Sequence, residues 1–243
     1  MTPRARVKTS IVVLVLIVLV LIVLVLIVAA FATYRVMDSR TYQLFGTLVD
    51  RVDTEEKVVA LTLDDGPSAT TPEVLQVLAD ADVPATFYVT GREMTERPEL
   101  GRAIVESGHE LGNHTETHRR MVFVGGDTVA QEIESTDTAI RAAGYDGEIS
   151  FRPPYGKKLL ALPRYLDSHD RTTVMWDVEP DSASSDTDEI VRIALDETRP
   201  GSIILLHVMY PSRASSLEAI PGIVDGLRAE GYRFVTVSEL LGR

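Results

Sequence analysis

The sequence predicts an α/β fold of about seven βα units, preceded by one N-terminal transmembrane helix. Short apolar runs alternate with helical patterns from Lys57 onward, which is typical of a parallel sheet covered by helices. Polar residues recur at the ends of several of these runs, which favours a closed barrel over an open sheet. The segment 11–32 is almost purely Ile, Val, Leu and Ala and carries no charge.

The segment 11–32 is expected to act as a membrane anchor. As a helix it would span about 33 Å, which is enough to cross a bilayer. Three basic residues, Arg4, Arg6 and Lys8, lie in the flank 1–10, so this flank should stay in the cytoplasm and the rest be exported. The alternative is a cleaved signal peptide and a secreted protein, because the run ends in a possible Ala-Phe-Ala cleavage site.

Composition restricts the partners of the exported part. The chain has 243 residues and a formal charge of −12, and residues 1–32 hold three positive charges and no negative ones, so the rest carries −15. Such an acidic domain should not bind nucleic acid or anionic lipid through bulk charge. The chain has no cysteine, which excludes disulfides and thiolate metal sites. We expect a linker at 33–56 and one domain at 57–243.

The elements of that domain can be placed by apolar runs and periodicity. Strands are expected at 58–63, 85–89, 109–112, 149–151, 172–178, 202–207 and 232–237. Helices are expected to begin at Thr71, with this threonine as N-cap, and to cover 98–107, 127–144, 157–169, 188–198 and 217–230.

Two adjacent carboxylates, Asp64 and Asp65, follow the first of these strands in the stretch Leu61–Pro67. The carboxyl end of a core strand is where α/β folds keep their chemistry. Neighbouring side chains there point in different directions, so one aspartate can bind a metal while the other acts as a base. A plain turn is the alternative interpretation.

Two histidines, His114 and His118, follow the third strand. At i and i+4 they would share one face of a helical turn and could reach one ion. With a distant aspartate they would form a three-ligand site that leaves a position open for water. A solvated surface pair is the alternative.

Two further strand ends carry candidate residues. Arg152 begins an Arg-Pro-Pro-Tyr stretch whose prolines fix the backbone, and it could hold a carboxylate in place. His207 ends the buried strand at 202–207. A rigid surface loop and a core histidine are the respective alternatives.

Together these pieces resemble the polysaccharide deacetylases, carbohydrate esterase family four, also described as chitin-deacetylase-like. The resemblance covers about 57–243, and its motifs are Thr62–Gly66, His114–His118, Arg152–Tyr155 and Leu205–His207. It implies an incomplete TIM-like (β/α)7 barrel that hydrolyses acetyl groups on glycans.

The resemblance also implies a metal site and a base. Asp65, His114 and His118 would hold a divalent metal, most commonly Zn²⁺, with Co²⁺, Mn²⁺ or Ni²⁺ possible. Asp64 would be the base that acts on water, and Arg152 would pair with it and orient it.

The other implied roles concern the leaving group and the substrate. The backbone N–H of Tyr155 would help to stabilise the oxyanion, and its side chain lies where substrate is expected. His207 would be the acid that protonates the departing amine, and Leu205 would line the acetyl pocket.

One motif departs from the family pattern, which has a tryptophan after an acidic pair. The region here reads Trp-Asp-Val-Glu-Pro-Asp, so Asp177, Glu179 or Asp181 could support His207, and Trp176 could supply the missing stacking surface or lie in the core. The expected reaction is N-deacetylation of peptidoglycan, an exopolysaccharide or a lipid-linked sugar. An O-acetyl esterase and an inactive glycan-binding relative are the alternatives.

Overall fold

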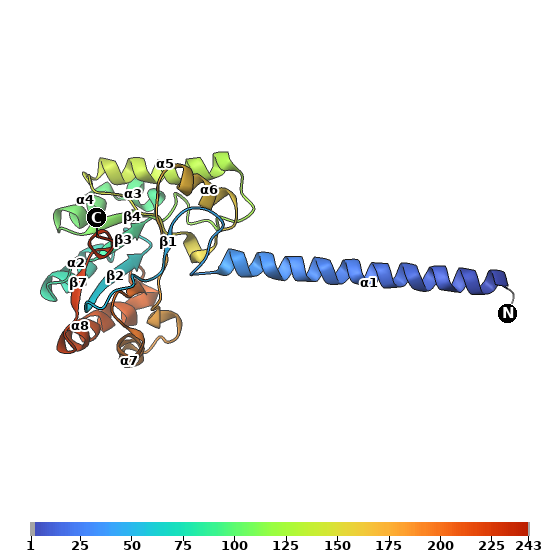
Figure 1. Ribbon diagram of the computed structural model, residues 1–243. Coiled ribbons are helices and arrows are strands. Elements are labelled where there is room, and N and C mark those ends of the chain that lie inside the picture. The colour runs from blue at the N-terminus through green and yellow to red at the C-terminus, as the bar shows by residue number, and fades with distance from the viewer. Residues whose placement is uncertain (1–2, 243) are drawn as a thin grey trace.

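The computed structural model describes residues 3–242 and consists of an α/β domain from which one long helix extends (Figure 1). This helix, α1, covers Pro3–Asp38. Among the described residues it is the one helix long and apolar enough to cross a membrane, and its apolar window makes no buried contact. A signal sequence has the same character. Met1 and Thr2 of the expected basic flank lie outside the described residues.

A parallel sheet forms the centre of the domain. Its strand order is β4 (Glu110–Asn113), β3 (Thr86–Val89), β2 (Val58–Asp64) and β6 (Ile203–His207), and β7 (Arg233–Val235) also pairs with β2. The register places Asp64 beside Tyr88 on one side and His207 on the other. The carboxyl ends of the strands therefore bring these polar residues to one edge of the sheet.

Single bridges continue the sheet into a ring. Phe151 pairs with Asn113 of β4 and with Thr173 of β5 (Thr173–Val174), and Val178 pairs with Ile204 of β6. The result is a variant of the TIM barrel with a parallel sheet, as the sequence predicts. The sequence predicts a short strand at 149–151 and a longer one at 172–178, but the double proline after Arg152 and the 3₁₀ turn at Pro180–Ser182 limit both segments to these short pairings.

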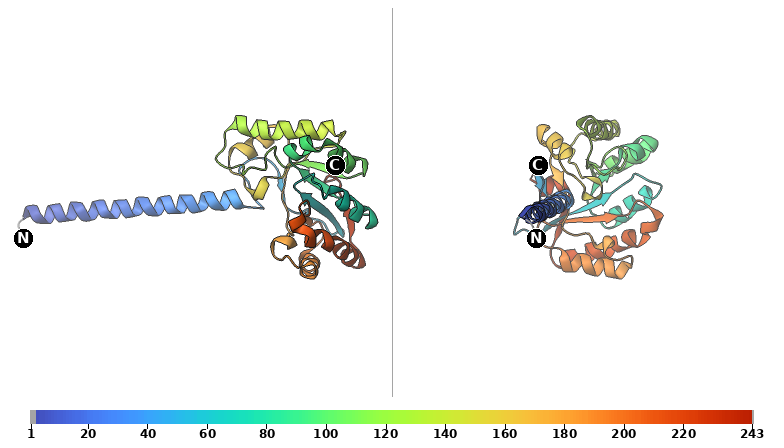
Figure 2. Two further views of the ribbon diagram at one scale, coloured as in Figure 1. Left: turned by 180° about the vertical axis from the view of Figure 1, so that it is seen from behind. Right: turned by 90° about the vertical axis from the view of Figure 1, so that its right-hand side faces the viewer.

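Helices cover the outside of the ring (Figure 2). Their bounds are α2 Thr71–Asp80, α3 Gly91–Glu96, α4 Pro98–Glu106, α5 Gly126–Ala142, α6 Ala161–Ser168, α7 Thr187–Glu197, α8 Ala214–Ala229 and α9 Val237–Leu240; 3₁₀ turns lie at Pro154–Gly156 and Pro211–Arg213.

Two helix starts differ from the expectation. Thr70, not Thr71, is the N-cap of α2, because the Thr71 hydroxyl accepts a hydrogen bond from the Ser68 N–H instead. The helix expected at 157–169 begins only at Ala161, because Lys157 and Lys158 are drawn into contacts with the end of α1.

Three apolar clusters hold the domain together. The largest lies between the sheet and the helices, the second lies inside the ring and includes Tyr88, Trp176 and Leu205, and the third includes Phe151. The ring interior also contains the fully buried Arg152. A buried guanidinium is costly unless it is paired, so its bonds define the chemistry of the site.

The segment 33–56, expected as a linker, is largely part of the folded structure. Its first residues extend α1 to Asp38, and Leu48–Val49 forms β1, which pairs in parallel with β5. The Arg51 guanidinium donates to the carbonyl of Pro200 at 3.0 Å. The mixed, polar composition of the segment gave no periodic signal for these contacts.

Candidate metal centre and active site

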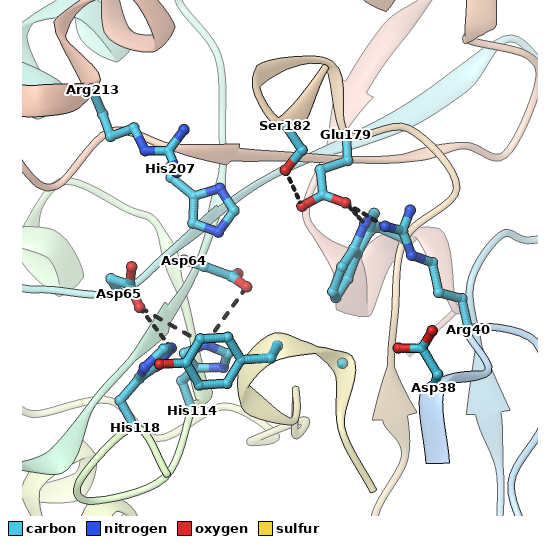
Figure 3. Close-up of a pocket in the computed structure, with 13 residues that line it drawn as sticks. Asp38, Arg40, Asp64, Asp65, His114, His118, Glu179, Ser182, His207 and Arg213 are labelled. Carbon is cyan, nitrogen blue, oxygen red and sulfur yellow. Dashed lines mark hydrogen bonds and ion pairs between the residues drawn. The ribbon is translucent and has the colours of Figure 1, made fainter. Parts of the chain in front are cut away.

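A cavity of about 440 Å³ opens at the carboxyl ends of the strands (Figure 3). Eight of the residues named from the sequence line it together with five others: Asp64, Asp65, His114, His118, Tyr155, Trp176, Glu179 and His207, with Asp38, Arg40, Gly156, Ser182 and Arg213. The structure therefore gathers residues from most of the chain in one place.

Three candidate metal ligands, one carboxylate and two imidazoles, meet at one side of this cavity. The Asp65 Oδ1 lies 3.2 Å from the His118 Nε2 and 3.9 Å from the His114 Nε2, and the three groups offer donor atoms within 4.8 Å of one another. The two histidines do not share a helical turn as expected. His114 follows β4 directly, and His118 lies in a loop with φ of +55°.

The backbone aims these ligands. Asp64 completes β2, but Asp65 has φ of +70°, so the chain turns sharply between them and their carboxylates point in different directions. The His114 Nδ1 lies 2.7 Å from the Arg152 carbonyl oxygen, which leaves Nε2 free to face Asp65. Burial lowers the pKa of His114, which favours the neutral imidazole that a metal requires.

These three residues fit a divalent metal. One carboxylate and two imidazoles, one of them held by the backbone carbonyl of Arg152, form a donor set that zinc and similar ions accept. The Asp65 carboxylate faces both imidazoles. The donor chemistry therefore agrees with the metal dependence expected from the sequence.

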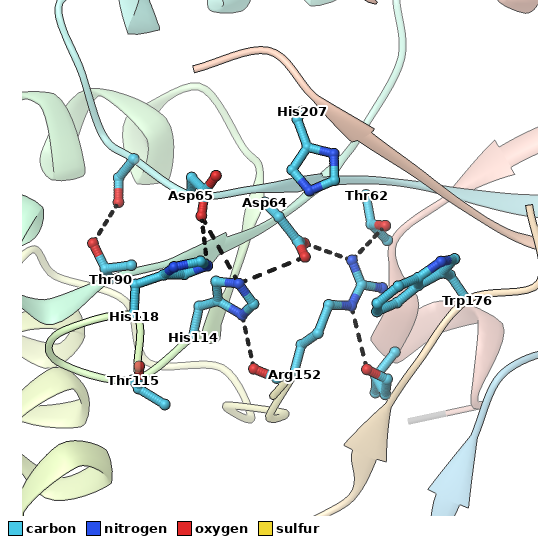
Figure 4. A network of polar contacts seen from close by, with 12 residues as sticks. Thr62, Asp64, Asp65, Thr90, His114, Thr115, His118, Arg152, Trp176 and His207 are labelled. Carbon is cyan, nitrogen blue, oxygen red and sulfur yellow. Dashed lines mark hydrogen bonds and ion pairs between the residues drawn. The ribbon is translucent and has the colours of Figure 1, made fainter. Parts of the chain in front are cut away.

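Asp64 is held by the buried Arg152 (Figure 4). The Arg152 Nη1 donates to the Asp64 Oδ1 at 2.6 Å and to the Thr62 Oγ1 at 2.8 Å. Its other nitrogens donate to the carbonyls of Val174 and Met175 at 3.2 and 3.0 Å. The other oxygen of Asp64 lies 3.7 Å from the His114 Nε2. Arg152 thus fixes one carboxylate oxygen and leaves the other toward the ligand cluster.

His207 lies across from these carboxylates, on the strand beside β2. Its Nδ1 lies 3.4 Å from the Asp181 Oδ2, and its backbone N–H donates to the same oxygen at 2.7 Å. Burial lowers the pKa of His207, but the Asp181 hydrogen bond and the carboxylates of Asp64, Asp181 and Asp65 raise it more, to about 9. These contacts favour the protonated form of His207.

The other two acids of this region make different contacts. Asp177 accepts hydrogen bonds from the Ser202 hydroxyl at 2.8 Å and the Ile203 N–H at 2.9 Å, at the start of β6. Glu179 accepts from the Trp176 indole at 2.8 Å and the Ser182 hydroxyl at 2.6 Å. Asp181 is thus the one of the three candidates that contacts His207.

The expected substrate residues have different surroundings. Tyr155 is exposed, has φ of +58° and packs its ring against His118 with 4.8 Å between centroids. Trp176 is buried and also borders the cavity. Leu205 lies deeper, in the apolar cluster inside the ring and not among the lining residues, so its substrate contact stays a prediction.

Four polar lining residues were not singled out from the sequence. Asp38 and Arg40 come from the end of α1, and Ser182 and Arg213 from the loops after β5 and β6. In sequence they look like ordinary juxtamembrane or surface residues, and only the folded chain brings them to the cavity.

The profile of the polysaccharide deacetylase family matches residues 51–174. A chitooligosaccharide deacetylase of Sinorhizobium fredii is 41% identical over 197 residues, which cover 76% of this chain and 92% of that protein. A peptidoglycan-N-acetylglucosamine deacetylase of Bacillus cereus is 32% identical over 210 residues, 81% of this chain and 93% of that protein. A bifunctional xylanase/deacetylase of Pseudobutyrivibrio xylanivorans is 34% identical, and the match spans only 30% of its length.

Solved structures agree with this result. A peptidoglycan N-acetylglucosamine deacetylase superposes with a TM-score of 0.75 at 30% identity, over 79% of this chain and 92% of that one. A family 4 acetyl xylan esterase of Clostridium thermocellum, in complex with a cobalt ion, superposes with a TM-score of 0.70 at 32% identity. The match covers 76% of this chain and 91% of that one. The chain therefore belongs to the polysaccharide deacetylase family and is a hydrolase of carbohydrate esterase family four, a group that depends on divalent metals.

Proposed function

We propose that this protein removes the acetyl group from N-acetylated sugars of an envelope or extracellular glycan. The observation that carries the proposal is the arrangement of Asp64, Asp65, His114 and His118 opposite His207 in one cavity. The substrates named for the relatives, peptidoglycan and chitooligosaccharides, support the chemical class.

A divalent ion at Asp65, His114 and His118 would supply a Lewis acid that polarises the acetyl carbonyl and makes a water molecule more acidic. Zn²⁺ is our first candidate, with Co²⁺, Mn²⁺ and Ni²⁺ as alternatives, because imidazole and carboxylate ligands suit these ions.

In this proposal Asp64 is the general base. Its oxygen away from Arg152 faces the ligand cluster, so it can accept a proton from water. Arg152 holds the carboxylate in one orientation through a charge-assisted hydrogen bond and is itself fixed by Thr62 and two carbonyls. Because the Asp64 carboxylate is already oriented, little reorganisation of this side chain is needed to reach the geometry of the reaction.

His207 is the proposed general acid. An amide nitrogen is a poor leaving group and needs a proton as the C–N bond breaks. The raised pKa keeps that proton on His207, and Asp181 orients the ring. The backbone N–H of Tyr155, in a turn of positive φ, would donate to the oxyanion, while Tyr155, Trp176 and Leu205 would contact the sugar or its acetyl group.

An O-acetyl esterase activity is the second candidate. The similarity to an acetyl xylan esterase favours it, because an ester and an amide need the same nucleophile and oxyanion stabilisation. The difference lies in the leaving group, which depends less on a proton donor in an ester.

We also propose that the chain is anchored in the cell membrane by α1, with the domain outside the cytoplasm. The length and composition of α1 and the basic residues before its apolar run support this orientation. Secretion after signal cleavage is the alternative.

The experiment that tests the function is acetate release by the purified full chain in detergent. The panel would hold chitooligosaccharides, peptidoglycan and O-acetylated xylan, each with chelator and with single added metals. We expect release from N-acetyl substrates, loss with chelator and recovery with Zn²⁺ or Co²⁺. Release from the O-acetyl substrate alone would favour the esterase, and no release with any metal would indicate an inactive glycan-binding relative.

A further inference from the structure

The end of α1 forms part of the cavity wall. Asp38 is the last residue of the helix, and both Asp38 and Arg40 line the cavity. Arg40 pairs with Glu179, and its guanidinium lies 4.7 Å from the centre of the Trp176 ring. The Arg152 guanidinium lies 5.4 Å from the centre of the same ring. The helix thus leads into the site without an intervening linker (Figure 3).

Two lysines fix this junction to the domain. The Lys158 N–H donates to the Met37 carbonyl at 3.2 Å, and its ammonium donates to the Ser39 carbonyl. The Lys158 side chain is almost fully buried, and a buried ammonium is costly unless it is bound. Lys157 pairs with Asp38. The junction at 37–40 is therefore a packed contact, and the domain cannot swing freely about the end of α1.

The packed junction sets the height of the cavity above a bilayer. The apolar run ends at Ala32, and the helix continues through residues 33–38, which add about 9 Å. Arg40 is two residues further, so the cavity wall lies within about 16 Å of the end of the apolar run. This distance is about half the thickness of a bilayer core.

Exposed apolar side chains occur close to the same junction. Tyr42, Leu44 and Phe45 follow it directly and are 53%, 39% and 38% exposed. Leu160, two residues after the clamping Lys158, is 55% exposed. Such residues beside a membrane helix are typical of the membrane–water interface, where apolar and aromatic side chains are stabilised.

We propose that the cavity faces the bilayer surface and that the substrate is an N-acetylated sugar carried on a lipid in the same membrane. This inference rests on the proposed deacetylase activity and membrane anchor. The contacts of Lys157 with Asp38 and of Lys158 with Ser39, here called the clamp, exclude a long flexible tether that would let the domain reach a distant polymer. A sugar held a few ångströms above the headgroups lies instead at the height of the cavity.

The test uses the full chain reconstituted in phosphatidylcholine vesicles. An 18-residue helical spacer between Ala32 and Thr33 would raise the domain by about 27 Å and keep its rotational phase, because it adds five whole turns. The matched control carries the same insertion after Thr2, before the apolar run. The substrates are a soluble chitooligosaccharide and the same sugar on a dialkyl lipid with a short or a long linker.

We expect the spacer to lower the rate on the short-linker lipid by about tenfold or more, because the site no longer reaches the sugar. The rate on the soluble sugar should stay unchanged, the long linker should restore the lipid-bound reaction, and the control insertion should have no effect. An unchanged rate of the spacer variant on the short-linker lipid would overturn the proposal.

Two further outcomes are distinguishable. If neither the parent nor any variant acts on the soluble sugar, the proposed deacetylase function is wrong. If only the spacer variant loses activity on the soluble sugar, the inference is tested with the parent protein alone, whose rate should be higher on the short-linker lipid than on the long-linker lipid. A parent rate that rises with linker length would place the cavity far from the bilayer and contradict the inference.

Discussion

At the scale of single residues, Asp64 and Asp65 are chemically identical neighbours in different environments. Asp64 ends a strand, is buried and accepts a hydrogen bond from the buried guanidinium of Arg152. Asp65 lies in a turn of positive φ and faces two imidazoles. One backbone turn thus supports the proposed division between a base and a metal ligand.

The substitutions Asp64→Asn and Asp65→Asn should therefore differ in kind. Asp64→Asn leaves the three ligands in place, so metal content should stay near that of the parent while turnover falls by about a hundredfold or more. Asp65→Asn removes a charged ligand, so metal content should fall and high metal concentration should partly rescue activity. Elemental analysis and rates at several metal concentrations measure both effects. Equal metal loss in the two variants would contradict the assignment.

The contact between His207 and Asp181 predicts a change in pH dependence. The pKa of His207 lies above its usual value, so the acid is present at neutral pH and is lost as pH rises through that pKa. Asp181→Asn removes an interaction that raises this pKa, so the alkaline limb of kcat/KM should move to lower pH. Asp177→Asn is the matched control, because Asp177 bonds to Ser202 and Ile203 instead. A limb that stays fixed in Asp181→Asn and shifts in the control would reverse their roles.

At the scale of elements, the sequence predicts the long, uniform segments well. The apolar run 58–63 and the helices with clear periods lie within a few residues of β2, α4, α5, α7 and α8. The segment 172–178 is shorter as a strand than the sequence predicts, and Phe151 forms only isolated bridges, because the length of a strand depends on its neighbours.

The candidate site shows the same limit. Residues in local motifs, such as His114 and His118, can be found from their spacing, although the loop between them was expected to be helical. Which acid contacts His207 could not be decided, because Asp177, Glu179 and Asp181 differ only in the direction the loop gives them. Arg40 gave no signal, because its partner Glu179 is distant in sequence.

The role of β1 predicts a difference between two truncated chains. A chain that begins at residue 57 lacks β1 and the Arg51 hydrogen bond to Pro200, and it exposes the edge of β5. A chain that begins at residue 39 keeps both. We expect the Tm of the shorter chain to be lower by several degrees. The lost burial and hydrogen bonds should reduce the free energy of unfolding by about 1–2 kcal/mol, which corresponds to a shift of this size. Circular dichroism on both chains measures this, and equal Tm values would show that β1 contributes no stability.

At the scale of the whole molecule, the proposed orientation of α1 in a membrane predicts protease access. If α1 crosses the membrane with its basic flank inside, external protease should degrade the domain on intact spheroplasts. The cytoplasmic flank, tagged at residue 1, should remain protected until lysis. Protection of the domain with digestion of the tag would reverse the orientation, and release of the domain into the medium would indicate signal cleavage.

If α1 crosses a membrane, the continuous helix and the contacts of Lys157 and Lys158 with its end also restrict how the chain can move. The domain extends to one side of α1 when seen along the helix (Figure 2, right). Translation in the plane and spin about the helix axis are then the easy motions, and each spin carries the cavity along a ring around the anchor. Collisions with a lipid-borne sugar would depend on molecules per unit area, so diluting the vesicles in buffer should leave the rate per enzyme unchanged.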